Sequence, residues 1–245
     1  MHRATVLLVM LHPSAVVTRA AVRELPEHAW DNALHAAVAA GTLHAAEADF
    51  ARRLPMARRA TFVAGREALR SALGQLPDRG DGDSYRDFAI LWTARGAPQL
   101  PSHVTGSVTH KDTLAMAAVA PRGTSLQHVG IDLERRPVEG DLHSRSIARK
   151  ILTAREFAYV QQWGEDTIEG RERILLHFAL KEAVYKAIDP YVERYVGFTE
   201  VELEFTDERP RVTLHLPETS VAEVRIEAGW ALEERWIVAW AGSHR

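Results

Sequence analysis

The chain has 245 residues, of which 46% are hydrophobic and 26% are charged, and this balance is typical of a globular protein with a buried core. Its length suits one large domain or two domains of about 120 residues, and its net charge of −3 gives no indication of a nucleic-acid-binding surface. Cysteine is absent, which excludes disulfides, thiolate metal ligands and a cysteine nucleophile and fits a reducing cytosol.

The first half of the chain predicts one long strand, three helices and three short strands. Residues 4–11, ATVLLVML, are predicted to form a buried strand, because a membrane helix needs about 20 apolar residues. Apolar spacing and turn residues predict helices at 28–40, 43–54 (with Thr42 as N-cap) and 56–76, a loop at 77–87, and strands near 88–92, 104–108 and 114–120.

The second half begins after the turn-rich stretch 121–128, so two domains are predicted, 1–126 and 127–245. A buried strand, VGIDLERRP, follows at 129–137. Thr153 and Glu156 form a predicted capping box, and a longer helix from 168 is expected to end at Asp189 before Pro190. Strands are predicted to begin at Glu200, Arg211 and Arg235, which makes the fold class α+β.

Asp132 and Glu134 stand two residues apart in the predicted strand, so their carboxylates share one face. Like charges this close raise each other's pKa unless a cation holds them together. Mg²⁺ binds through a few carboxylate oxygens, water and substrate phosphate, and this pair could supply such oxygens. Alternatively, the two acids lie at the end of a strand and pair with Arg135 or Arg136.

Glu182 and Lys186 are four residues apart in the predicted helix HFALKEAVYKAI and therefore share a face. Leu175 and Phe178 place Glu182 at the edge of the apolar stripe, where a carboxylate needs a partner. A cation held jointly with the strand acids would serve. The alternative is an ordinary ion pair on the helix surface, which contributes only about 0.3–0.5 kcal/mol.

Two further stretches carry groups that suit phosphate. Arg58, Arg66 and Arg70 recur at spacings of eight and four, and arginine binds phosphate oxygens in pairs, although such a helix face is often simply solvated. In RGAPQLPSHVTGSVTH, residues 95–110, glycines and prolines predict a close, stiff loop that ends in donors from Thr109 and His110. Alone, His110 is also compatible with a purely structural role.

Together the four stretches resemble the stand-alone 4′-phosphopantetheinyl transferases, the surfactin and enterobactin class. The resemblance is carried, in order, by RRATFVAGR, GAPQLPSHVTGSVTH, VGIDLE and FALKEAVYKA, and it covers about residues 58–198. Ala179 and Leu180 depart from the residues usual in this family, and Thr109 replaces the commoner serine while keeping a hydroxyl. Residues before Leu54 match too poorly to transfer any role.

The resemblance implies an α+β fold of two similar subdomains related by a pseudo-twofold, with coenzyme A in the cleft between them. It implies a cytoplasmic, monomeric enzyme that transfers the 4′-phosphopantetheine arm of coenzyme A to a serine of an apo acyl or peptidyl carrier protein. The product 3′,5′-adenosine bisphosphate leaves. The implied cofactor is Mg²⁺, with Mn²⁺ as a possible substitute, and coenzyme A is the co-substrate.

The resemblance also implies roles for individual residues. Asp132, Glu134, Glu182 and the carbonyl of Leu133 would bind the metal. Asp132, Glu182 and Lys186 would be catalytic and contact the cofactor, with Glu182 as either a third ligand or the general base. The remaining implied contacts to coenzyme A are Arg58, Arg66, Arg95, Gly96, Ala97, Pro98, Thr109, His110 and Val196.

Two other functions remain open from the sequence: a catalytically silent module that binds coenzyme A or a carrier protein, and another Mg²⁺-dependent enzyme such as a phosphohydrolase or nuclease. Carrier domains are usually acidic near the target serine, so a basic patch of Arg52, Arg53 and Arg59 could steer one to the site. The sequence does not specify the carrier or whether the pathway makes a siderophore, a polyketide or another secondary metabolite.

Overall fold

The computed structural model describes residues 15–76, 85, 87–123, 125–143, 147–205, 209–216 and 224–245. Contacts between residues divide the chain after Gly123 into two compact units, which we call the N-terminal unit (to residue 123) and the C-terminal unit (from residue 125). The predicted strand at 4–11 and most of the predicted loop at 77–87 lie outside the described residues. Among the described helices, none is both long and apolar enough to cross a membrane.

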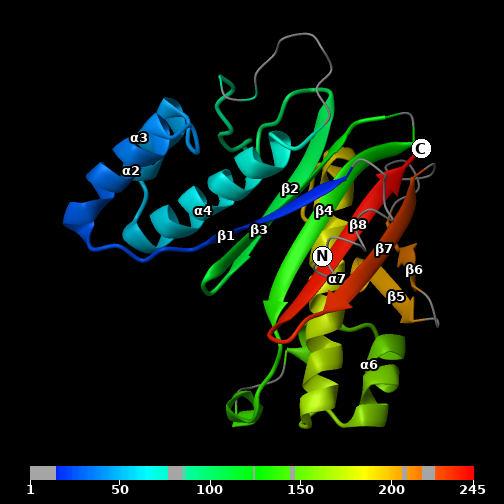
Figure 1. Ribbon diagram of the computed structural model, residues 1–245. Helices are drawn as coiled ribbons and strands as arrows, with labels where there is room; N and C mark the ends of the chain where they lie inside the picture. Colours follow the sequence, from blue (N-terminus) through cyan, green and yellow to red (C-terminus); the bar gives the residue numbers. More distant parts are fainter. Residues whose placement is uncertain are drawn as a thin grey trace. The chain divides into compact units, whose positions relative to one another are not determined.

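The N-terminal unit contains a three-stranded antiparallel sheet with a long helix, α4, on one face (Figure 1). The sheet order is β1-β3-β2. In chain order, the elements of the N-terminal unit are β1 (Val16–Ala21), η1 (Glu27–Ala29), α2 (Trp30–Ala39), α3 (Ala45–Arg52), α4 (Met56–Leu73), β2 (Val104–Lys111) and β3 (Leu114–Pro121).

Small side chains let α4 lie close to this sheet. A Cβ atom built on Gly65 would lie 3.2 Å from a methyl carbon of Val108 on β2. Thr18 of β1 donates a hydrogen bond of 2.5 Å to the carbonyl of Ala68 on the helix. Leu69 and Leu73 fill the space between helix and sheet, and burial of such side chains contributes about 1.5–3 kcal/mol each.

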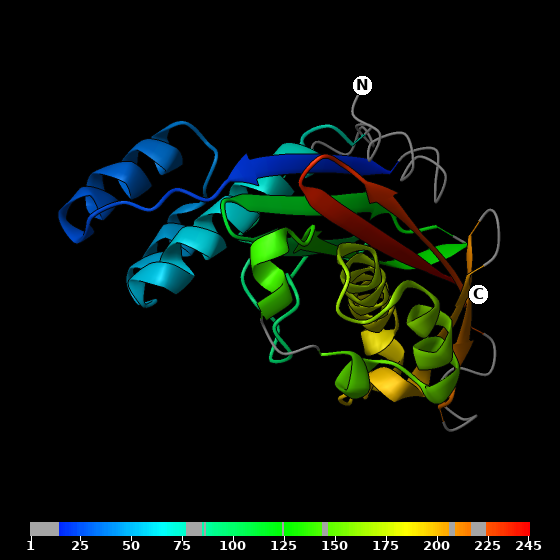
Figure 2. The ribbon, with the colours of Figure 1, turned by 90° about the horizontal axis from the view of Figure 1, so that it is seen from below.

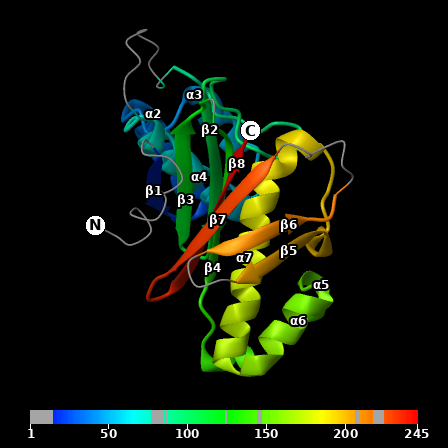
Figure 3. The same cartoon turned by 90° about the vertical axis from the view of Figure 1, so that its right-hand side faces the viewer.

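The C-terminal unit has a second three-stranded antiparallel sheet, of order β4-β8-β7, and a separate hairpin, β5-β6. The long helix α7 lies against the sheet (Figure 3), and α5 and α6 lie on the side of α7 away from β8 (Figure 2). The elements are β4 (Leu126–Arg135), η2 (Glu139–His143), α5 (Ala148–Ile151), α6 (Ala154–Val160), η3 (Gln161–Trp163), α7 (Ile168–Val192), η4 (Phe198–Glu200), β5 (Val201–Phe205), β6 (Pro210–Leu214), β7 (Arg225–Leu232) and β8 (Trp236–His244).

The two sheets have the same topology. In each unit the first strand pairs with the last, the last strand is central, and the long helix comes between the first strand and the other two. The hairpin β5-β6 is an addition between α7 and β7 of the C-terminal unit. The predicted α+β class is confirmed.

Two predicted helix ends were wrong. Thr42 is not the N-cap of α3: His44 is, because its Nδ1 accepts the amide of Ala46 at 3.1 Å and Glu47 accepts the amide of His44 at 2.8 Å. The helix α7 does not end before Pro190 but continues to Val192. Proline is tolerated there because it removes only one hydrogen bond close to the helix end. The predicted capping box of Thr153 and Glu156 is confirmed.

Strand predictions failed where the partner strand, rather than the sequence pattern, decides the structure. Residues 88–92 contain only an isolated bridge between Trp92 and Pro98 and no strand. The sequence analysis did not identify β1 or β7. Strand β7, RIEAGWAL, is rich in residues with a low preference for strands, and it forms because β8 pairs with it along its length.

Candidate active site

Strand β4 carries the two predicted acids on the face that α7 covers. Asp132 and Glu134 are each 7% exposed. Gly130 precedes Asp132 by two residues and therefore lies on the same face of the strand, where it lies against the backbone of α7. The neighbouring strand β8 presents small or aliphatic residues beside the acids, since Asp132 pairs with Ala239 and Glu134 with Ile237. On the side of β8, therefore, the two acids have apolar neighbours.

Gly130 permits an unusually close approach of helix and strand. A Cβ atom at this position would lie 1.9 Å from the carbonyl oxygen of Ala183 and 3.0 Å from the amide nitrogen of Ala187. Both of these atoms belong to the helix backbone, which cannot move aside as a flexible side chain could. Because α7 comes so close at Gly130, the helix residues Glu182 and Lys186 are brought to the acids of the strand.

Lys186 is the cationic partner of Asp132. Its Nζ lies 2.8 Å from Asp132 Oδ1 and also donates to the carbonyl of Ile131 at 2.8 Å. Lys186 therefore pairs with an acid of the strand and does not form an ordinary surface pair with Glu182. Arg135 binds Asp141 and Arg136 binds Glu172, so each of these arginines has a carboxylate partner outside strand β4.

Glu182 lies within electrostatic reach of both strand acids. Burial raises the pKa of the Glu182 carboxyl, and the charges of Asp132 and Glu134 raise this pKa further. The Lys186 ammonium opposes these effects. The site therefore combines Asp132 and Glu134 of one strand with Glu182 and Lys186 of one helix, and Lys186 pairs with Asp132.

The donor chemistry of this group suits a hard divalent cation, which prefers carboxylate oxygens. In the described part of the chain, however, no three His, Cys, Asp or Glu side chains are arranged so that they could hold a metal ion. Lys186 takes up one oxygen of Asp132 instead. The three acids, and the predicted contribution of the Leu133 carbonyl, thus fit Mg²⁺ in ligand type, while their coordination geometry stays a prediction.

The arginines of α4 do not form one solvated face. Arg58 is exposed, whereas Arg66 is only 1% exposed. Arg66 donates to the carbonyls of Ile90 and Leu91, and its guanidinium lies 4.4 Å from the ring centre of Phe62. Burial lowers the pKa of Arg66 to about 10, so it stays charged at neutral pH. These two bonds use two of the five N–H groups of Arg66, so its predicted contact with a phosphate depends on the other N–H groups becoming accessible.

The predicted basic patch for a carrier protein loses one of its three members. Arg59 is 8% exposed and donates to the backbone carbonyls of Ala51, Arg52 and Leu54. It also pairs with Glu27 at 2.9 Å. Arg59 therefore stabilises the packing of α3 against α4. Arg52 is half-buried and Arg53 is exposed, and their role in docking stays a prediction.

Residues 93–98 form a close loop, which confirms the first part of the loop predicted at 95–110, whereas residues 104–110 belong to strand β2. The amide of Thr93 donates to the carbonyl of Ala97 at 2.8 Å, and the amide of Gly96 donates back to the carbonyl of Thr93 at 2.9 Å. Gly96 has a φ of +83°, which other residues rarely adopt. Arg95, Gly96 and Ala97 are exposed and Pro98 is half-buried, so the tip of the loop is open to a ligand.

Thr109 and His110 are neighbours in strand β2, and their side chains therefore point to opposite faces. Thr109 is buried, as are Thr105 and Ser107 on the same face, whereas His110 is exposed. The two side chains therefore cannot approach one phosphate from the same face of the strand, and their contacts with coenzyme A stay a prediction. Val196 is also buried, in the hydrophobic core around α7, so its predicted position beside a bound cofactor is not evident.

Comparisons with known proteins give the same family for both units. Residues 46–120 match the 4′-phosphopantetheinyl transferase N-terminal domain. Residues 128–241 match the 4′-phosphopantetheinyl transferase superfamily. The chain belongs to the 4′-phosphopantetheinyl transferase superfamily.

Two members of this superfamily are each 32% identical to the chain. One is the 4′-phosphopantetheinyl transferase Npt of Nocardia iowensis, aligned over 164 residues, 66% of this chain and 66% of the relative. The other is the 4′-phosphopantetheinyl transferase PptT of Mycobacterium tuberculosis, aligned over 162 residues, 65% of this chain and 63% of the relative. The matched part is less than two thirds of either relative's own length.

Solved structures of holo-acyl-carrier-protein synthases are also similar to parts of the chain. The Thermotoga maritima protein is 23% identical with a TM-score of 0.35, covering 48% of this chain and 62% of that one. The Plasmodium yoelii protein is 21% identical with a TM-score of 0.39, covering 47% and 92%. The Helicobacter pylori protein, solved in complex with coenzyme A, is 18% identical with a TM-score of 0.37, covering 47% and 98%.

The sequence analysis missed the buried ionic groups that support this transferase fold. Lys181, next to Glu182, is 1% exposed and binds Glu156 at 2.6 Å and the carbonyls of Ile151 and Phe198. Glu156 was identified only as part of a capping box. Its position three residues after the N-cap is the one signal that could have suggested a fixed, buried carboxylate.

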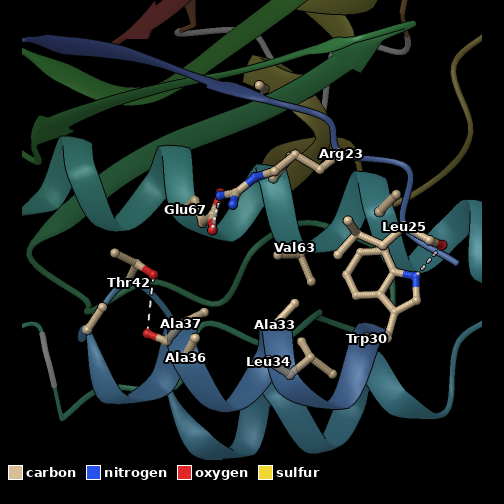
Figure 4. Close-up of a pocket in the computed structure, with 14 residues that line it drawn as sticks. Arg23, Leu25, Trp30, Ala33, Leu34, Ala36, Ala37, Thr42, Val63 and Glu67 are labelled. Atoms are coloured by element: carbon tan, nitrogen blue, oxygen red, sulfur yellow. Dashed lines mark hydrogen bonds and ion pairs between the residues drawn. The ribbon is translucent and has the colours of Figure 1, made fainter. Parts of the chain in front are cut away.

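A cavity of about 260 Å³ lies in the N-terminal unit between α2, α4 and the end of β1 (Figure 4). Alanine side chains of both helices and Trp30 line it, and the ion pair of Arg23 with Glu67 borders it. None of the residues predicted to bind the metal or coenzyme A lines this cavity.

Proposed function

We propose that the protein transfers the 4′-phosphopantetheine arm of coenzyme A to a serine of an apo acyl or peptidyl carrier protein. Membership of the superfamily supports this proposal. The observation that carries it is the ion pair of Lys186 with Asp132, placed beside Glu134 and Glu182 where α7 meets β4. This arrangement combines one cation and three carboxyl groups, which are the groups that phosphoryl transfer needs for charge neutralisation and proton transfer.

In the proposed reaction, the serine oxygen forms a bond to the phosphorus that carries the pantetheine arm. The bond from this phosphorus to the bridging oxygen breaks, and 3′,5′-adenosine bisphosphate leaves with that electron pair. Glu182 accepts the serine proton, a role that suits a carboxyl group whose pKa is raised. Lys186 stabilises the negative charge that develops on the leaving phosphate.

Asp132 and Glu134 would hold Mg²⁺, with Mn²⁺ as a substitute, and Glu182 would act either as a third ligand or as the base that accepts the serine proton. When bound, the metal would polarise the phosphoryl oxygens as a Lewis acid. The chain's own contribution is to keep the acids on one side of β4 and to exclude water, since Asp132 and Glu134 are almost completely buried. Glu182 reaches the two strand acids from α7 because Gly130 allows α7 to lie close to β4.

The N-terminal unit would bind the nucleotide part of coenzyme A. Arg58, the tip of the loop at residues 95–98 and His110 are exposed and carry charged, polar or backbone donors. Arg66, Thr109 and Val196 are buried, so their proposed contacts require local movement. We also infer a cytoplasmic location, because a chain without cysteine fits a reducing cytosol. The family resemblance supports a carrier from siderophore, polyketide or related secondary metabolism.

The test is incubation of the purified protein with coenzyme A, Mg²⁺ and an apo carrier protein. Mass spectrometry should show a carrier heavier by one phosphopantetheine arm, and chromatography should show release of 3′,5′-adenosine bisphosphate. An unmodified carrier would contradict the proposal. Binding of coenzyme A without transfer would indicate a silent binding module, and cleavage of coenzyme A without a carrier would indicate a phosphohydrolase.

Two variants sharpen this test. Asp132→Ala should abolish transfer, because it removes a predicted metal ligand and the partner of Lys186. Asp141→Ala is the matched control. It also removes an aspartate from an ion pair, but the partner is Arg135 of β4, which has no predicted role in the site. Full activity of Asp132→Ala would contradict the assignment of the site.

A further inference from the structure

Glu47 is a completely buried carboxylate in α3, with 0% exposure. It accepts hydrogen bonds from the guanidinium of Arg70 on α4 at 2.8 and 2.9 Å and from its own helix start at His44. It also accepts the amide of Ile90 at 2.6 Å. One side chain thus connects two helices to the segment before the loop at 93–98.

The same segment is held by arginine side chains at its carbonyl groups. Arg70 donates to the carbonyls of Tyr85 and Phe88, at 3.1 and 2.7 Å. Arg66 donates to the carbonyls of Ile90 and Leu91, at 2.5 and 3.4 Å. Residues 88–91 belong to no sheet, so these side chains replace the bonds that a partner strand would make.

The loop itself begins directly after this segment. Trp92 packs edge-on against Phe50 of α3 and Phe62 of α4, with ring centres 5.2 and 5.3 Å apart. The amide of Gln99 donates to the carbonyl of Leu91 and closes the base of the loop. The base of the loop is therefore fixed to the same two helices that Glu47 and Arg70 join.

We propose that Glu47, Arg66 and Arg70 are positioning residues for the loop at 93–98. They fix its base, so that the exposed tip is already in place for the nucleotide part of coenzyme A. Arg66 acts on the loop through its hydrogen bonds to the carbonyls of Ile90 and Leu91. This role of the loop in binding coenzyme A depends on the proposed function, whereas the fixation of the loop does not.

The C-terminal unit contains the same arrangement, which argues that it is a device of this fold. Glu156 also stands three residues after an N-cap and is 1% exposed. It binds a cation of the long helix, Lys181, and accepts the amide of Leu203 from a separate segment at 2.8 Å. A buried charge whose partner is removed destabilises its surroundings, so each pair is sensitive to a single substitution.

The test compares amide hydrogen exchange in Glu47→Gln with that in the wild type. The amides of Ile90, Thr93, Gly96 and Ala97 should exchange about tenfold faster or more, as expected when a buried hydrogen bond is lost. Glu156→Gln is the matched control, because it makes the same substitution in the equivalent pair and should leave these amides unchanged. Wild-type exchange in a folded Glu47→Gln protein would overturn the proposal.

Arg66→Met provides a second variant in case Glu47→Gln does not fold, because it leaves the pair of Glu47 with Arg70 intact. It should accelerate exchange at residues 90–97, and protection equal to that of the wild type would contradict the proposal. In carrier-modification assays, Arg66→Met should raise the KM for coenzyme A about tenfold with little change in kcat. If Arg66 acted only by contact with a phosphate, Arg66→Met would raise the KM for coenzyme A to the same extent but leave the exchange unchanged. A wild type without transferase activity would refute the proposed function but not the exchange result.

Discussion

Lys186 and Asp132 face each other between α7 and β4, with the ammonium nitrogen 2.8 Å from a carboxylate oxygen. This pair identifies the cation that balances the acids of the strand in the absence of a metal. Lys186 is partly exposed, at 27% of its side chain, whereas Asp132 is nearly buried. The pair therefore lies at the boundary between the core and a surface that a ligand can reach.

The free energy of unfolding should report this pair in a double-mutant cycle. Lys186→Met should destabilise the protein because it leaves Asp132 charged, buried and beside other carboxylates. Asp132→Asn should restore part of the loss, with a coupling free energy of about 0.5–3 kcal/mol. Urea denaturation of the four proteins measures this coupling, and strictly additive effects would show that the two side chains do not interact in solution.

Mg²⁺ should raise the melting temperature of the wild type, because a bound divalent cation relieves the repulsion between the three carboxylates. The expected increase is about 2–4 °C for each kcal/mol of binding free energy. Glu182→Gln should lose most of this increase, and EDTA should reverse it in the wild type. Glu172→Gln is the control, since Glu172 lies on the same helix but pairs with Arg136. An equal increase in both variants would exclude Glu182 as a ligand.

His177 should make the stability depend on pH. Its ring is fully buried against Phe205, its Nδ1 lies 2.7 Å from the carbonyl of Arg173, and its Nε2 has no hydrogen-bond partner in the described structure. Burial is the main cause that lowers the pKa of His177, and the Lys181 and Arg173 charges act in the same direction. The Arg173 carbonyl and Glu156 oppose this shift.

Because the unfolded chain then binds a proton more readily than the folded one, stability should be complete above the unfolded pKa of about 6.5 and should fall as the pH decreases below it. His177→Leu should reduce the slope of the unfolding free energy between about pH 5 and 6.5, measured by urea denaturation. At pH 8 the free energy of unfolding of the variant should differ from that of the wild type by no more than about 1 kcal/mol, because the substitution removes an unsatisfied buried nitrogen. An unchanged slope would show that another group titrates.

Gly130→Ala should destabilise the C-terminal unit. The added methyl group would overlap the backbone of Ala183, so α7 must move away from β4 at a cost of about 1–3 kcal/mol or more. Transferase activity should fall with it, because Glu182 and Lys186 move with the helix. Gly140→Ala is the control, as no atom lies within 4 Å of its added Cβ. Thermal unfolding of the two variants measures the difference, and equal melting temperatures would contradict the close contact.

The strand acids and the helix pair were predictable because their patterns are local. Alternation along β4 places Asp132 and Glu134 on one face, and the spacing of four does the same for Glu182 and Lys186. The fate of Arg66 and Arg70 was not predictable in this way, since helical spacing shows which residues share a face but not whether that face is buried. Their partners, Glu47 and the carbonyls of residues 85–91, are distant in sequence.

The missed strands have a related explanation. Residues 88–92 are apolar and resemble a strand, but side chains satisfy their backbone groups. Strand β7 is poor in strand-forming residues but is held by β8. The family motifs were recognisable despite these errors, because they depend on residue identities rather than on the pairing of distant segments.

The position of the central strand has a consequence for synthesis. In both sheets the middle strand is the last of that sheet's three strands in chain order, so neither sheet can assemble stepwise as the polypeptide emerges. A nascent chain that stops before residue 236 would contain the four side chains of the candidate active site but no partner strand for β4. The N-terminal unit could already be folded at that moment, while the acid-bearing strand would stay an open edge that favours aggregation or chaperone binding.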